Sequence, residues 1–82
     1  MAKVKYDVEL RRITGRNEEE IPSGSVKALL KEIDRRYGKA AYMQAKRSMI
    51  AVDGLNCLML KGNKTELSSE SMVCFYPICG GG

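Results

Sequence analysis

The sequence predicts a two-layer α+β domain, in which one mixed sheet of four to five strands carries one main helix across one face. Three observations predict this class. Residues 2–10 alternate polar and apolar side chains, residues 26–37 repeat apolar side chains at helical spacing, and residues 72–77 form a continuous apolar run typical of a central strand. A chain of 82 residues has room for one such domain with one small core.

The first strand is expected over residues 2–10, where every second residue is apolar: Ala2, Val4, Tyr6, Val8 and Leu10. Residues 14–17 contain Gly15 and Asn17, which favour a turn. The short segment after this turn, residues 18–22, is predicted to return as an antiparallel partner of the first strand.

The main helix is predicted to begin after Ser23 or Ser25, since either serine can cap its first turn. Its apolar residues form one stripe that can pack on a sheet: Val26, Leu29, Leu30, Ile33 and Tyr37. Gly38 stands where a helix commonly ends in a left-handed residue. Residues 39–47 fit a second short helix or a loop, and the pattern does not choose between them.

Two short strands are expected on either side of Asp53-Gly54, a dipeptide typical of hairpin turns. The next segment is polar, with Leu67 alone available for the core, and it leads to the final strand at residues 72–77. Because side chains alternate along a strand, only one of Phe75 and Tyr76 can face the helix.

Composition excludes several classes of protein. The chain has no histidine, and its three cysteines have no zinc-site spacing, which argues against a metal site or a disulfide scaffold. No apolar segment has the length of a membrane span or the pattern of a signal peptide, so a cytoplasmic protein is expected. The net charge of +4 comes from basic residues spread along the chain. We interpret them as solvated surface, with docking to an acidic protein partner as the alternative.

The C-terminal residues resemble a known family. Small subunits of molybdopterin synthase close with an apolar strand of the type V-x-F-F-P-P-V-x-G-G, and seven residues here match it in register: Val73, Phe75, Tyr76, Pro77, Ile78, Gly80 and Gly81. Together with the order of strands and helix, this ending resembles the MoaD/ThiS family of ubiquitin-like sulfur carriers, and within it the molybdopterin type. Two departures are Ser69 to Ser71, where the family often has Asp-Gly-Asp, and the additional Gly82.

This resemblance implies a β-grasp domain over residues 1–77 and a flexible glycine-rich tail over residues 78–82. In the family, an activating enzyme uses ATP to adenylate the C-terminal carboxylate, and sulfur from a persulfide donor then displaces AMP to leave a thiocarboxylate. The carrier itself binds no cofactor. Its tail next enters the large catalytic subunit of molybdopterin synthase, so the carrier is a co-substrate and not an enzyme by itself.

The same resemblance assigns roles to the last residues. Gly81 or Gly82 carries the reactive carboxylate, depending on whether Gly82 is trimmed, and Gly80, Cys79 and Ile78 complete the tail. Phe75, Pro77 and Ile78 are the expected partner anchors. Cys79 could attack an activated tail, although a small apolar filler is its simpler role.

Other functions remain open on the sequence. The sulfur could serve thiamin synthesis, tRNA thiolation or a tungsten cofactor, or the adenylated carboxylate could be joined to lysines by a ubiquitin-like modifier. A basic nucleic-acid-binding module ranks below these, because no recognition motif accompanies the basic residues. No nucleic-acid or membrane partner is expected.

Overall fold

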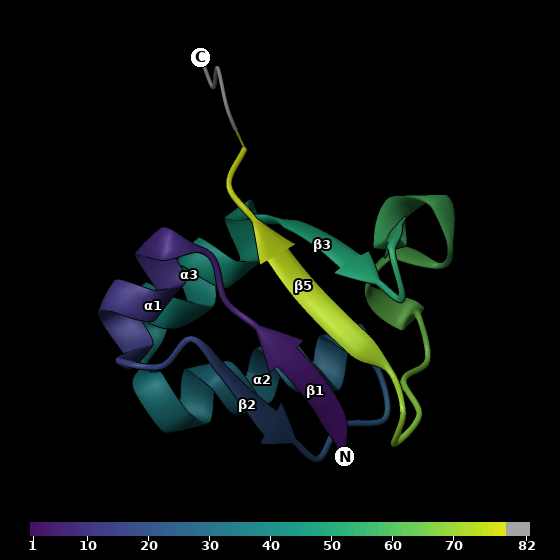
Figure 1. Ribbon diagram of the computed structural model, residues 1–82, viewed down its shortest axis with the longest axis horizontal. Helices are drawn as coiled ribbons and strands as arrows, with labels where there is room; N and C mark the ends of the chain where they lie inside the picture. The colour runs from purple at the N-terminus through teal and green to yellow at the C-terminus, as the bar shows by residue number, and fades with distance from the viewer. Residues whose placement is uncertain (79–82) are drawn as a thin grey trace.

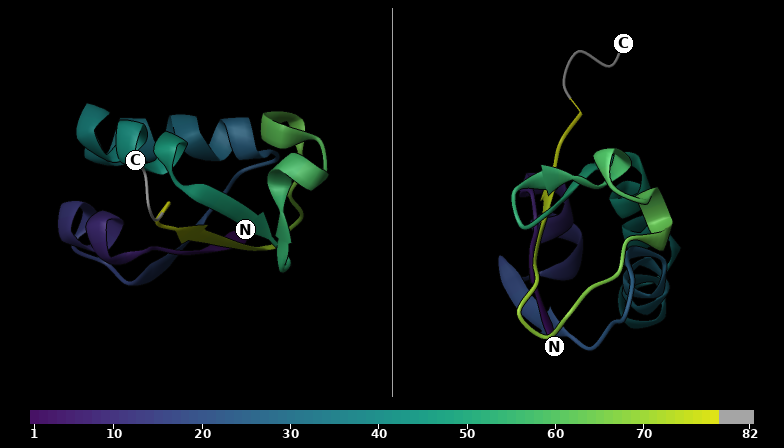
Figure 2. Two further views of the ribbon diagram at one scale, coloured as in Figure 1. Left: turned by 90° about the horizontal axis from the view of Figure 1, so that it is seen from above. Right: turned by 90° about the vertical axis from the view of Figure 1, so that its right-hand side faces the viewer.

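A computed structural model describes residues 1–78 of the chain, and its strands form one mixed sheet. The strand order across this sheet is β2 (Glu18–Ile21), β1 (Ala2–Lys5), β5 (Met72–Tyr76), β3 (Met49–Val52) and β4 (Leu55–Asn56). Figure 1 shows β5 in the middle of this sheet, and Figure 2 shows the helices α2 (Val26–Tyr37) and α3 (Lys39–Arg47) together on one side of it. The predicted two-layer β-grasp class is confirmed, and within residues 1–78 two further α-helices accompany the predicted main helix. None of the described helices is long and apolar enough to cross a membrane.

The first strand is shorter than predicted. β1 spans Ala2–Lys5, and the residues expected to continue it form helix α1, Val8–Thr14. The Asp7 carboxylate accepts a hydrogen bond from the Leu10 amide at 2.8 Å and caps the helix. Gly15 ends the helix in the left-handed region, with φ of 76°. The strand prediction for residues 6–10 is wrong because these caps outweigh the alternating pattern.

The antiparallel return strand is confirmed as β2, Glu18–Ile21, which pairs with β1 from Ala2↔Ile21 to Lys5↔Glu18. The turn predicted at residues 14–17 therefore does not connect two adjacent strand ends. It follows α1 and brings the chain back to the edge of the sheet.

The main helix α2 spans Val26–Tyr37, and the Ser25 hydroxyl accepts a hydrogen bond from the Ala28 amide at 3.1 Å. The undecided segment is helix α3, Lys39–Arg47, which buries Ala41 and Ala45. Gly38 separates the two helices with φ of 91°, a backbone angle at which residues with a Cβ are strained.

The hairpin at Asp53-Gly54 is confirmed between β3, Met49–Val52, and β4, Leu55–Asn56. Its second strand has only two residues, because the Asn56 side chain accepts from the Leu58 amide and begins the 3-10 turn η1, Cys57–Met59. A second 3-10 turn, η2, spans Gly62–Lys64, and Leu67 is buried as predicted.

The last strand β5, Met72–Tyr76, is central as predicted and pairs in parallel with β1 and antiparallel with β3. The core lies between the sheet and the α2–α3 layer, and its largest fully buried side chains are Leu10, Ile21, Leu29, Ile33, Val4, Val26 and Val73.

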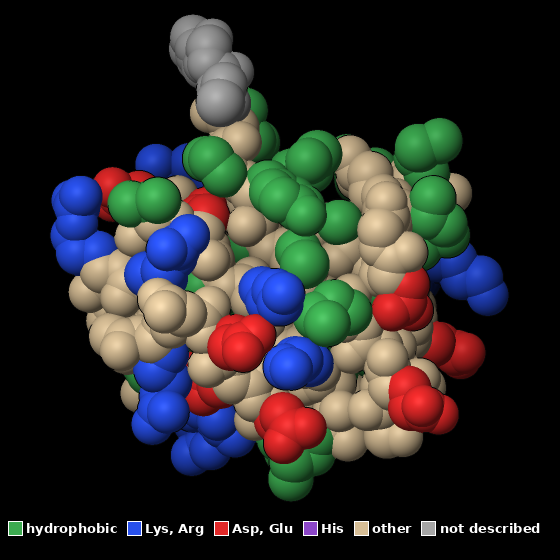
Figure 3. Space-filling model, viewed as in Figure 1, with side chains coloured by type: hydrophobic (Ala, Val, Ile, Leu, Met, Phe, Trp, Pro, Cys, Tyr) green, Lys and Arg blue, Asp and Glu red, His purple; other side chains and the backbone are tan. Residues whose placement is uncertain are grey.

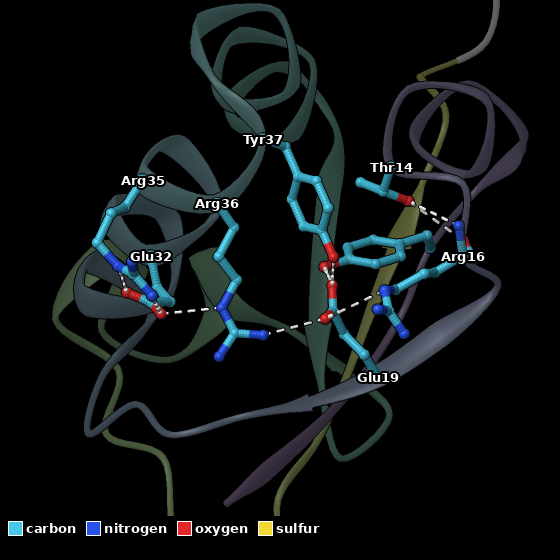
Figure 4. A network of polar contacts seen from close by, with 8 residues as sticks. Thr14, Arg16, Glu19, Glu32, Arg35, Arg36 and Tyr37 are labelled. Atoms are coloured by element: carbon cyan, nitrogen blue, oxygen red, sulfur yellow. Dashed lines mark hydrogen bonds and ion pairs between the residues drawn. The ribbon is translucent and has the colours of Figure 1, made fainter.

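A buried carboxylate connects the edge of the sheet to the helices (Figure 4). The side chain of Glu19 is only 8% exposed. Its Oε2 accepts hydrogen bonds from the hydroxyls of Tyr6 at 2.5 Å and Tyr37 at 2.6 Å, and its Oε1 accepts from Arg36 at 3.1 Å. Burial and the bond to Glu19 raise the pKa of the Tyr6 phenol, so it stays a neutral donor. Glu19 thus links β2 to α2 and to Tyr6, the residue that directly follows β1.

We predict that Glu19→Gln lowers the free energy of unfolding by about 1–3 kcal/mol, because the neutral amide loses charge-assisted hydrogen bonds to buried donors. Urea titration measures this loss. The matched control is Glu20→Gln, which removes the same charge from an exposed residue of the same strand. Equal stability of the two variants would contradict the role given to Glu19.

A second prediction concerns Glu32, whose pKa is lowered from 4.5 to about 2 by hydrogen bonds from Arg35 and Arg36. A lowered carboxyl pKa stabilises the fold above the ordinary value, and this contribution disappears as the pH falls toward 2. We therefore expect the stability difference between the native chain and Glu32→Gln to be constant above pH 4.5 and to vanish near pH 2. Denaturation curves across this range test it, and a difference independent of pH would refute it.

Candidate functional site

The candidate site is the end of β5, where the chain leaves the centre of the sheet. β1 runs parallel to β5 and ends at Lys5, opposite Cys74, while β3 runs antiparallel and begins at Met49, opposite Tyr76. The start of α1 and the end of α3 lie at this same end of the sheet (Figure 1). The last described residues, Pro77 and Ile78, therefore leave the sheet with β1 and α1 on one side and β3 and α3 on the other.

The sequence-predicted site residues lie in different surroundings. Phe75 is 2% exposed and stacks on Tyr6, with ring centroids 6.0 Å apart, so its side chain belongs to the core. The expectation that Phe75 contacts a partner does not fit this burial. Pro77 is exposed, and Ile78 is 64% exposed, so both are accessible to a partner. Cys79, Gly80, Gly81 and Gly82 lie outside the described residues.

A hollow of about 280 Å³ lies on the β1 side of the exit, and we call it the α1 groove. Its two cationic side chains are Lys5 and Arg11. The guanidinium of Arg11 donates to the Tyr6 carbonyl at 3.2 Å, which holds it beside the groove. Its lining residues are Lys5, Tyr6, Asp7, Val8, Arg11, Cys74, Phe75, Tyr76 and Pro77.

A second hollow of about 370 Å³, the α3 groove, lies on the β3 side and includes Ile78 in its wall. Lys46 and Arg47 supply its charge, and Met49 and Leu58 supply exposed apolar surface. Cys57 also lines it, but burial raises the pKa of this thiol, so it stays neutral near pH 7. The other lining residues are Ser48, Ile50, Asn56 and Asn63.

Positive charge dominates both grooves. Within residues 1–78, the ion pairs involve Arg12, Arg16, Arg35 and Arg36, and none involves a basic residue of either groove. The one carboxylate among the groove residues is Asp7, which is 6% exposed and accepts from Leu10 and Ser48. The exit of β5 therefore presents a field that attracts an acidic surface.

Apolar side chains continue this site onto the face of the sheet that the helices leave open (Figure 3). Alternation along β5 turns Met72, Cys74 and Tyr76 to this face, and Met49 lies across from Tyr76 on β3. The neighbouring Cys74 raises the pKa of the Tyr76 phenol, so this exposed ring carries no charge near neutral pH. Among the described residues, no three His, Cys, Asp or Glu side chains converge as in a metal site.

Sequence reasoning did not single out Lys5, Arg11, Lys46 or Arg47. A usable signal existed for two of them, since Lys46 and Arg47 precede a later strand, whereas Lys5 lay inside the first strand as predicted over residues 2–10. In a mixed sheet with the last strand in its centre, residues that directly precede a neighbouring antiparallel strand lie beside the end of that last strand. Arg11 gave no signal, because its position depends on the unpredicted helix α1.

The comparisons with known proteins agree with the fold. The ThiS family model matches residues 4–82. No curated protein sequence matches the chain. Small archaeal modifier protein 1 from Methanosarcina acetivorans has a similar structure, with a TM-score of 0.86 at 22% identity over 99% of this chain and 95% of that chain.

Two further solved structures are similar. A chain of the BexX/CysO complex from Amycolatopsis orientalis gives a TM-score of 0.85 at 16% identity, and the match covers 100% of both chains. A candidate molybdopterin converting factor, subunit 1, from Pyrococcus furiosus gives 0.71 at 27% identity over 93% of this chain and 94% of that one. At 22% and 16% identity, the likeness to the first two of these structures establishes the fold alone.

Proposed function

The chain belongs to the ThiS family of ubiquitin-like carrier proteins, and from this premise we infer that it is a sulfur carrier. We propose that its C-terminal glycine carboxylate is adenylated and converted to a thiocarboxylate. The sulfur then serves molybdopterin synthesis, with the chain acting as the small subunit of molybdopterin synthase. One observation carries the proposal: β5 leaves the centre of the sheet between two basic grooves, and the sequence continues from there to Gly80, Gly81 and Gly82.

The proposed chemistry uses the chain end as the reacting group. The carboxylate attacks the α-phosphate of ATP and releases pyrophosphate. The outer sulfur of a persulfide on the donor then attacks the acyl adenylate, and AMP leaves. A second thiol cleaves the resulting acyl disulfide, which leaves the thiocarboxylate on the carrier and a disulfide on the donor.

Glycine suits this chemistry because a residue without a Cβ can pass through a narrow channel and adopt backbone angles closed to other residues. Ordering such a segment in an active site costs conformational entropy, which contacts of the folded domain must offset. Pro77 restricts φ where the chain leaves the sheet, and the exposed Ile78 offers an apolar anchor beside Leu58 in the α3 groove.

The charges of the exit support an acidic partner. Lys5 and Arg11 stand on one side of the departing chain, and Lys46 and Arg47 stand on the other. Both the activating enzyme and the large synthase subunit are proposed to present acidic side chains around the channel that receives the tail. The apolar residues Tyr76 and Met49 on the open face of the sheet would be covered in the same contact.

The molybdopterin role rests on the match of residues 73–81 to the family ending and on the likeness to the Pyrococcus furiosus protein. Thiamin synthesis, tRNA thiolation and tungsten cofactor synthesis use the same carrier chemistry. The likeness to small archaeal modifier protein 1 favours a second candidate, in which the adenylated carboxylate is joined to lysine amines of other proteins. The two candidates share the activation step and differ in the nucleophile.

We predict that the chain gains about sixteen mass units, the difference between sulfur and oxygen, on incubation with its activating enzyme, ATP and a persulfide donor. Intact mass spectrometry measures this gain. A chain lacking Gly80, Gly81 and Gly82 is the control and should gain nothing, and one lacking Gly82 alone tells which glycine reacts. Attachment to lysines without thiocarboxylate would favour the modifier, and no activation at all would refute both candidates.

We also predict that Arg47→Glu weakens binding to the activating enzyme at least tenfold, because it places a negative charge beside an acidic partner. Calorimetry or surface plasmon resonance at several salt concentrations measures the effect. Lys31→Glu is the matched control, since it makes the same change of charge on the exposed surface of α2. Equal weakening by both variants would attribute the effect to net charge and not to the α3 groove.

A further inference from the structure

A ridge of exposed apolar side chains lies at the edge of the sheet that carries β4. It comprises Leu58 and Met59 of η1, the following Leu60 and the neighbouring Leu55, which are 80%, 78%, 41% and 53% exposed. In Figure 1 this segment lies at the right-hand side, beyond β3. Burying such side chains removes apolar surface from water and is favourable, so a cluster of four marks an interaction surface.

A hollow of about 550 Å³ lies directly beside this ridge, and we call it the edge hollow. Val52, Leu55 and Leu60 make its apolar walls, and Asp53, Lys61, Thr65 and Glu66 add polar groups. Leu55 and Leu60 belong to both features, while Leu58 faces the α3 groove on the other side of η1. A protruding apolar turn and a receptive apolar hollow therefore occupy one continuous patch.

The charges around the edge hollow differ from those at the exit of β5. Asp53 and Glu66 carry negative charge and Lys61 carries positive charge, and none of them forms an ion pair within residues 1–78. A surface with both signs can be complementary to a second copy of itself under two-fold symmetry, in which each contact occurs twice. The grooves at the exit, whose exposed charges are all basic, would instead repel a second copy.

We propose that the edge hollow binds a second copy of this chain. In this two-fold dimer, Met59 and Leu60 of each copy pack into the edge hollow of the other, and Lys61 of each copy pairs with Glu66 of the other. The ridge and the edge hollow together comprise nine residues, fewer than the roughly 20–30 residues that each partner contributes to a standard stable interface, so the association is weak, in the micromolar to millimolar range. The α1 groove lies across β5 and β3 from this edge and stays uncovered.

Sedimentation equilibrium over micromolar to millimolar concentrations tests the dimer. The native chain is expected to show a reversible, concentration-dependent dimer, and Met59→Glu should weaken it at least tenfold. Met43→Glu is the matched control, because Met43 is an exposed methionine of α3 outside the patch. If the native chain stays monomeric at all these concentrations, the proposal is overturned. It is also overturned if Met59→Glu dimerises as strongly as the native chain.

A pair of charge variants tests the two-fold arrangement. Lys61→Glu alone and Glu66→Lys alone should each weaken the dimer, because each brings like charges together across the interface. An equimolar mixture of the two variants should form heterodimers, since both intermolecular pairs are then restored. A mixture that associates no better than the separate variants overturns the proposed pairing. Neither experiment involves the activating enzyme, so its outcome is independent of the sulfur-carrier proposal.

Discussion

The position of β5 is the constraint on which the rest of the structure depends. Among the described strands, β2 and β1 form one half of the sheet and β3 and β4 form the other, and β5 alone joins them. The sheet is complete only when residues 72–74 have paired with residues 3–5, near the opposite end of the chain. Such distant pairing pays loop-closure entropy before it gains hydrogen bonds. In return, hydrogen bonds on both sides fix the point at which Pro77 leaves the sheet.

This central position also divides the strand between stability and binding. Val73 and Phe75 point into the core, where Phe75 stacks on Tyr6, and Tyr6 in turn donates to the buried Glu19. Cys74 and Tyr76 lie on the open face. Phe75, which the family resemblance offered as an anchor, therefore packs in the core beneath the site. Its exposed neighbour Tyr76 is the aromatic residue that a partner can contact. The two-residue period of a strand decides this assignment.

Local patterns predicted the elements that local interactions determine. The stripe of α2, the Asp53-Gly54 turn and the apolar run of β5 are each visible in a short window of sequence. Helix α1 was missed because Leu10 fits both a strand and a helix, and the Asp7 cap decides between them. Glu19 stands in a run of three glutamates that looks like surface, and only the packing of Tyr6 and Tyr37 around it makes it structural. The basic grooves likewise could not be predicted from short windows of sequence, because the order of strands in the sheet brings their residues together.

The distribution of charge carries information that the net charge of +4 does not. The exit of β5 is surrounded by basic side chains, which would speed the encounter with an acidic partner. This attraction would weaken as salt screens the charges. The β4 edge combines both signs with exposed leucine and methionine, so the proposed association there would depend more on apolar burial and respond less to salt. A basic surface repels a second copy of itself, whereas a surface with charges of both signs can pair with its copy. Two surfaces of one small domain can thus select different partners. Under the two proposals made above, the separation of these patterns on either side of η1 would let the chain associate with itself while the α1 groove stays free for an acidic partner.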